Sequence, residues 1–164
     1  MDTALTALIV IGILILTVVT LSERYFSAQD AIMESWQEAE ERAVERARTD
    51  ISPVSAETTP LGNGVRIKLR NEGDAKLADF DRWDVILRYT GVDGYHAEWY
   101  PHNSGVKQWT NTIYENFEPG ILNPEEEMLI EVWFPLSSAV SSPTTNTVVI
   151  ATPNGITAST VFTH

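Results

Sequence analysis

Residues 4–21 read Ala-Leu-Thr-Ala-Leu-Ile-Val-Ile-Gly-Ile-Leu-Ile-Leu-Thr-Val-Val-Thr-Leu, a run that contains no charged side chain. As an α-helix this run is about 27 Å long, because each residue adds about 1.5 Å. The hydrocarbon core of a bilayer is about 30 Å thick, so the helix nearly spans it. Apolar side chains lie on every face of such a helix, and every face must therefore be buried in lipid or against protein.

Three interpretations of residues 4–21 differ in what buries the helix. A secretory signal peptide has a basic start and a cleavage site of small residues. Residues 1–3 contain no base, and residues 22–25 (Ser-Glu-Arg-Tyr) make a poor cleavage site. A plain membrane anchor keeps the helix in lipid, whereas a filament-core helix leaves the membrane and joins a bundle of identical helices. We favour the filament-core helix, with the plain anchor as the alternative.

The segment 22–50 continues the helix with a different pattern. It contains no Gly or Pro and is rich in Glu, Arg, Ala and Gln, which favour helices. Apolar residues recur along one face at helical spacing: Tyr25, Ala28, Ile32, Trp36, Ala39, Ala43 and Ala47. Pro53 restricts the residue before it, so the helix is expected to stop nearby. The sequence predicts one helix over residues 3–51, apolar all round at first and amphipathic afterwards.

From Ser52 onward the apolar period changes from about 3.6 residues to about 2, which is typical of β-strands. We expect strands at 65–70, 83–90, 95–100, 128–134, 146–152 and 156–162, with 54–58 as a further candidate and 106–127 as a long loop. About seven short strands, separated by Gly, Pro and Asn, predict an immunoglobulin-like antiparallel β-sandwich. The expected fold class is therefore α+β, with a helical domain over 1–51 and a sandwich domain over 52–164.

The alternating positions of these strands predict the sandwich core. The candidates are Val65, Ile67, Leu69, Trp83, Val85, Leu87, Ile130, Val132, Phe134, Val148, Ile150 and Val161. The chain contains no Cys, so neither a disulfide nor a thiolate metal site is available.

The rest of the composition excludes several functions. A net charge of -12 argues against a nucleic-acid partner, because phosphate binding needs clustered Lys and Arg. No nucleophile motif or phosphate loop occurs, and His96 and His102 are only a weak metal signal. Carboxylates in residues 79–84 suit Ca²⁺, but they lack the EF-hand pattern and more simply form a solvated loop. We therefore expect no enzyme, no cofactor and no metal site.

The whole arrangement resembles the archaellin and archaeal type IV pilin family. The resemblance rests on residues 4–21, on the strand and turn at 65–73, and on a C-terminal block. In that block Asn123-Pro124-Glu125-Glu126-Glu127 precedes the strand at 128–134, and residues 148–155 lead into the last strand. The resemblance implies a structural subunit of an extracellular helical filament, archaellum-like or pilus-like, for motility or adhesion. Its implied partners are copies of itself, the membrane before assembly, and a filament assembly platform or motor.

In that interpretation the subunits polymerise through their N-terminal helices. Burying one Leu or Ile side chain contributes about 1.5–3 kcal/mol, so a bundle of such helices is strongly held. The predicted polymerisation interface consists of Leu5, Leu8, Ile9, Ile11, Ile13, Leu16, Val19, Tyr25, Ile32 and Trp36.

A second family shares much of the arrangement. The archaellar stator proteins, which anchor the motor to the surface layer, also combine an N-terminal membrane helix with a β-sandwich, and residues 71–77 suit them. Two features depart from the pilin pattern: no basic leader precedes the apolar run, and the fifth apolar position is not Glu. Asp2 is the one acid near the start of the run. The alternative function is therefore a membrane-anchored stator or binding module. Whether Met1 is a processed end stays open.

Overall fold

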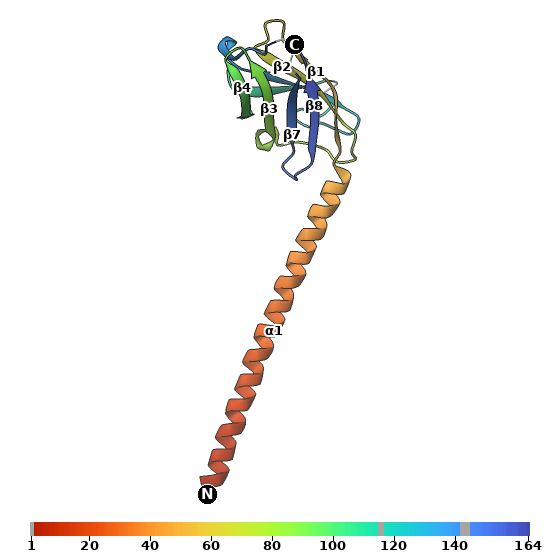
Figure 1. Cartoon of the computed structure of the whole chain (residues 1–164). Helices are drawn as coiled ribbons and strands as arrows, with labels where there is room; N and C mark the ends of the chain where they lie inside the picture. Colours follow the sequence, from red (N-terminus) through yellow and green to blue (C-terminus); the bar gives the residue numbers. More distant parts are fainter. Residues whose placement is uncertain (1, 115–116, 142–144) are drawn as a thin grey trace. The chain divides into compact units, whose positions relative to one another are not determined.

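The computed structural model describes residues 2–114, 117–141 and 145–164, and for residues 2 and 4–6 it describes the backbone alone (Figure 1). The chain forms two compact units, one up to Ala43 and one from Val44 to the C-terminus. The domain boundary predicted between residues 51 and 52 stays a prediction.

The first element is the helix α1, Asp2–Arg48. It is long and apolar enough over Ala7–Arg48 to be a candidate membrane span, and its apolar window is not buried by the rest of the chain. The helix ends at Arg48 and not at the predicted residue 51. The reason is tertiary: the carbonyl of Arg48 accepts the backbone N–H groups of Asp74 and Ala75, and Ile51 already pairs with Asn71 in a sheet.

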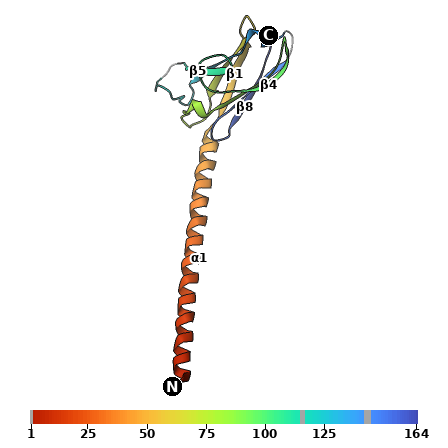
Figure 2. The ribbon, with the colours of Figure 1, turned by 90° about the vertical axis from the view of Figure 1, so that its left-hand side faces the viewer.

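Within the described residues, eight strands follow the helix and form the sandwich. Their bounds are β1 Ile51–Thr58, β2 Gly64–Asn71, β3 Asp84–Gly91, β4 Gly94–Tyr100, β5 Gln108–Ile113, β6 Glu127–Trp133, β7 Asn146–Ala151 and β8 Thr157–Phe162, with short 3₁₀ turns η1 at Phe80–Arg82 and η2 at Leu136–Ser138. One antiparallel sheet has the order β1-β2-β6-β5 and the other the order β4-β3-β7-β8. Figure 2 shows both layers from the side, with β1 and β5 in one and β4 and β8 in the other. This order is that of an immunoglobulin sandwich with an added C′ strand, which is β4.

The core lies between the two sheets. Every predicted core residue is buried except Val161, which is 60% exposed. The prediction was wrong for Val161 because β8 turns Ala158 and Phe162 inward, and the alternation of a strand then places Val161 on the outer face. Trp109 of β5 and Tyr89 of β3 are among the largest fully buried side chains, so both sheets contribute aromatic rings to one core.

The predicted loop over 106–127 was wrong in its first part, where the structure has the strand β5. Only Trp109 in this strand is fully buried, and polar residues occupy most other positions, so no apolar alternation marks it. The strand forms because its whole length pairs with β6, from Gln108 opposite Trp133 to Ile113 opposite Met128. The candidate strand at 54–58 belongs to β1, which tolerates Pro53 because it lies at the sheet edge beside a register shift.

Candidate functional site

The apolar part of α1 is the first candidate functional region. The described members of the predicted polymerisation interface are all exposed: Leu8, Ile9, Ile11, Ile13, Leu16, Val19, Tyr25, Ile32 and Trp36. Leu5 belongs to the same set, but its side chain lies outside the described residues. Exposed apolar surface on this scale marks a membrane or protein contact. The role of these residues in polymerisation stays a prediction.

The second candidate region is the outer face of the sheet β1-β2-β6-β5, which is lined with ion pairs. Arg66 Nε lies 2.8 Å from Glu131 Oε1, and Lys68 Nζ lies 2.6 Å from Glu127 Oε2. A third pair joins Arg70 to Glu125. The hydrogen bond to Glu127 raises the pKa of Lys68. Because its charges are already paired across strands, this face is a solvated surface with little charge left to attract a partner.

The outer face of the sheet β4-β3-β7-β8 carries fewer charged side chains than the outer face of the first sheet. The strand register places Trp99, Ile86, Val149 and Ser159 in one row across the sheet, and Ala97, Arg88, Thr147 and Val161 in the next. Asp84 and Arg88 are the charged side chains of this face, and Asp84 accepts a hydrogen bond from the indole N–H of Trp99 at 2.8 Å. This face therefore combines Trp and Arg with apolar neighbours and few charges, a composition typical of the centre of a protein interface.

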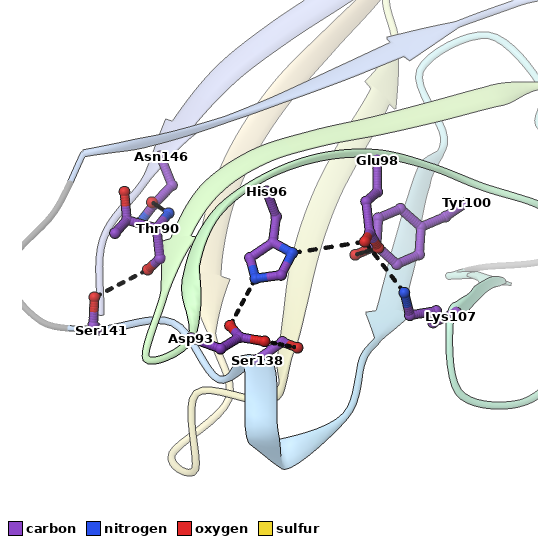
Figure 3. A network of polar contacts seen from close by, with 9 residues as sticks. All are labelled: Thr90, Asp93, His96, Glu98, Tyr100, Lys107, Ser138, Ser141 and Asn146. Carbon is purple, nitrogen blue, oxygen red and sulfur yellow. Dashed lines mark hydrogen bonds and ion pairs between the residues drawn. The ribbon is translucent and has the colours of Figure 1, made fainter.

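A network of polar side chains lies beside β4 (Figure 3). The imidazole of His96 lies between two carboxylates, 2.7 Å from Asp93 and 3.6 Å from Glu98. Ser138 Oγ donates to Asp93 at 2.8 Å, and Lys107 Nζ donates to Glu98 at 3.2 Å. The network therefore joins the β3–β4 turn to η2 and to the segment before β5.

The contacts in this network change the pKa values of its members. The hydrogen bonds from His96 and then Ser138 lower the pKa of Asp93. Partial burial raises the pKa of Glu98, but the hydrogen bond and charge of Lys107, together with the hydrogen bonds of His96 and Tyr100, outweigh it and lower the pKa. Burial raises the pKa of Tyr100, whose hydroxyl stays neutral and donates to Glu98. Both carboxylates are thus charged and held in place at neutral pH.

The residues behind the two weak metal signals have other partners in the structure. His96 belongs to the network just described, and His102 contacts Asn111 Oδ1 at 2.8 Å. In the loop 79–84, Asp79 caps η1 with a left-handed backbone, and Asp84 accepts from Trp99. Among the described residues, no group of three or more His, Asp or Glu side chains is placed to hold a metal ion.

Sequence reasoning missed the network and the contrast between the two outer faces. Both depend on which residues lie opposite each other across strands, and the sequence alone does not fix that register. The alternation of His96 and Glu98 with Tyr95, Ala97 and Trp99 was the available signal, because a strand that alternates charged and aromatic side chains has two unlike faces.

No protein-family model matches the chain. Among solved structures, it is similar to the archaellum periplasmic stator protein FlaG from Sulfolobus acidocaldarius, with a TM-score of 0.56, 27% identity and coverage of 70% of this chain and 99% of that one. It is also similar to a chain of the archaellum periplasmic stator complex of FlaF and FlaG from the same organism, with a TM-score of 0.55, 26% identity and coverage of 68% and 87%. An uncharacterised protein of Archaeoglobus fulgidus is 28% identical over 155 residues, which is 94% of this chain and 91% of that protein.

These similarities contradict the prediction of a filament subunit that polymerises through its helix. The matched structures are archaellum stator proteins, and one of them is solved as a complex of two different proteins and not as a homopolymer. The error has a physical cause: an apolar helix is equally well buried by lipid and by its own copies, so composition does not separate an anchor from a filament core. The chain is therefore similar to archaellum stator proteins, and these findings favour the alternative interpretation over the first.

Proposed function

We propose that this chain is a membrane-anchored stator subunit of an archaellum. The observation that carries the proposal is its similarity to FlaG, which extends over 99% of that chain at 27% identity. The exposed apolar helix supports it independently, because a stator must be held in place against the torque of a motor. The proposed partners are the membrane, a second stator component comparable to FlaF, and the motor that both would hold.

The proposed role of α1 as an anchor follows from the need of its exposed apolar side chains to be buried. In lipid, the exposed apolar side chains of residues 7–21 are buried on all faces of the helix, and each large one contributes about 1.5–3 kcal/mol. The sandwich, which carries its own core, projects from the outer side of the membrane as a rigid docking body. We infer that it performs no chemistry, and that its role is to bind.

The proposal is tested by deleting the gene in a producing archaeon and examining motility and filaments separately. We expect cells that still carry filaments of normal composition, by electron microscopy and mass spectrometry of sheared material, but that do not swim. The tagged chain should remain in the washed membrane fraction. Loss of filaments, or recovery of this chain as their main component, would overturn the stator proposal.

A further inference from the structure

We propose that the outer face of the sheet β4-β3-β7-β8 is a docking surface for the same face of a second copy of this chain. The inference goes beyond the proposed function and does not depend on it. Figure 1 shows the four strands in one layer. Trp99 of β4 and Val161 of β8, both on the outer face, are 57% and 60% exposed, so the described part of the chain leaves this face open.

Arg88 is the one cation on the described strands that has no carboxylate partner. The three cations of β2, on the other outer face, each pair with a glutamate. Arg88 projects from β3 and is exposed, and its neighbours in the same row, Ala97 of β4 and Thr147 of β7, carry no charge. The guanidinium is therefore free to bind a carboxylate of a second molecule.

Asp84, the other charged side chain of this face, lies four residues before Arg88 on the same strand. Four residues of a strand span about 13 Å, so the two side chains point outward together but are too far apart to pair within one chain. Asp84 Oδ1 accepts the indole N–H of Trp99 at 2.8 Å, and among the described residues no partner binds Oδ2. This second oxygen can accept a hydrogen bond from a guanidinium of another molecule.

The order of the two charges makes the face complementary to itself. A two-fold axis between two copies, parallel to their sheets and crossing β3 at Ile86, makes the two β3 strands antiparallel. It places Arg88 of each copy opposite Asp84 of the other. Packed sheets lie about 10 Å apart, a gap that an Arg and an Asp side chain cross together. Parallel β3 strands would instead place Arg88 opposite Arg88, so the charges select the antiparallel arrangement.

The row along this axis supplies the apolar centre of the contact. The strand register aligns Trp99, Ile86, Val149 and Ser159 in it, and each of them meets its own counterpart in the second copy. The hydrogen bond to Asp84 already fixes the Trp99 ring, which lowers the entropy lost on binding. Such a two-fold contact uses the same face on both copies and closes on itself, so it yields a dimer and not a filament.

Charge reversal tests the pairing. We expect the full-length chain in detergent to form a dimer in sedimentation experiments. Asp84→Arg and Arg88→Asp each bring like charges together across the contact, and each should weaken the association at least about tenfold. An equimolar mixture of the two variants should dimerise again, because the two cations of one face the two acids of the other. Arg66→Asp, on the other outer face, is the control and should dimerise like the wild type.

Cross-linking tests the position of the axis, and the chain contains no Cys that could interfere. Ser159→Cys lies in the row on the axis and should cross-link to itself with a short thiol-reactive linker. Thr157→Cys and Val161→Cys lie two residues away on either side and on the same face of β8. Neither should cross-link to itself, but a mixture of the two should cross-link, because the axis places each opposite the other.

The melting temperature of each variant checks that it is folded. A wild-type chain that stays monomeric at every concentration overturns the inference, and so does a dimer that survives both single charge reversals. A dimer that cross-links through Val161→Cys alone, and not through Ser159→Cys, overturns the proposed axis. If the wild type is monomeric and Arg88→Asp abolishes swimming in cells, the face binds a different protein and the assignment to a second copy is wrong.

Discussion

Leu14 in the helix and Leu69 in the sandwich are the same type of residue but differ in their exposure to solvent. Leu14 is 58% exposed, and Leu69 is fully buried. The sandwich buries its own apolar side chains and therefore contains the source of its stability. The helix offers equally apolar side chains, such as Leu14, that stay exposed in the described structure. The comparison separates the part that buries its own apolar side chains from the part whose apolar side chains need a partner or a lipid environment.

The sharpest way to break this comparison is to make the same substitution in both regions. Leu69→Ala should destabilise the sandwich by about 2–5 kcal/mol, because it leaves a cavity in a packed core. Leu14→Ala should change the unfolding of the sandwich by less than about 0.5 kcal/mol. Denaturant unfolding of the full-length chain in detergent, followed by the fluorescence of buried Trp83 and Trp109, measures both. A similar loss in the two variants would contradict the independence of the sandwich.

The converse experiment introduces a charged side chain into the apolar part of the helix. Leu14→Asp should lower the fraction of the chain that inserts into the membrane, because an acid at the centre of a spanning helix costs about 2.5–3.5 kcal/mol. Leu61→Asp is the control, since Leu61 is a similarly exposed leucine of the sandwich. Carbonate-washed membranes should retain more of the control than of Leu14→Asp. Equal retention of the two variants would contradict insertion of the helix at Leu14.

The sequence was a good guide wherever a local pattern repeats. The apolar run, the change of period near residue 52 and nearly all of the core followed from periodicity. It failed where long-range pairing decides the outcome. The strand β5 exists because it lies along β6, and Val161 is exposed because β8 packs through Ala158 and Phe162. The helix ends at Arg48 because residues 74 and 75 bind its carbonyl.

The polar network beside β4 lay beyond the sequence for the same reason. The alternation in residues 95–99 is visible, but it does not say that β4 lies at a sheet edge or that Asp93, Ser138 and Lys107 lie next to it. The filament interpretation failed for a different reason: the apolar helix fits lipid and a helix bundle equally well, and nothing in the residues chooses between them. Only the similarity to stator proteins separated the two.

A smaller effect is expected from one buried polar side chain of the sandwich. The Asn71 amide donates to the carbonyls of Ala75 and Leu122, at 2.8 and 3.1 Å, and its oxygen accepts from the N–H of Gly73. Asn71→Ala leaves these buried groups without partners and should cost about 1–3 kcal/mol in the same unfolding experiment. Asn123→Ala, on a less buried amide, should cost less. Equal losses would show that Asn71 acts by filling space.

The ion pairs on the outer face of the sheet β1-β2-β6-β5 should contribute less than Asn71 to the free energy of unfolding. Exposed pairs contribute about 0–1 kcal/mol and are screened by salt. Arg66→Ala removes the partner of Glu131 and should lower stability slightly at low ionic strength, with the difference vanishing in molar salt. Arg88→Ala, on the other outer face, should show no such salt dependence in the isolated chain. A salt-independent loss for Arg66 would mean that its aliphatic stem, and not its charge, supports the sheet.

The smallest expected effect concerns the pH dependence of the sandwich. The hydrogen bonds from His96 and Ser138 lower the pKa of Asp93 below its ordinary value of 3.8, so the folded state holds this proton less tightly than the unfolded state. Its stabilisation is therefore complete above that value and disappears as the pH falls through the lowered pKa. Asp93→Asn should melt earlier than the wild type at neutral pH, and the two melting temperatures should converge as the solution is acidified. Asp81→Asn, in another exposed turn, controls for the loss of one negative charge. A constant gap between Asp93→Asn and the wild type at every pH would show that Asp93 holds the β3–β4 turn through its shape, and that its charge contributes nothing to the order of the turn.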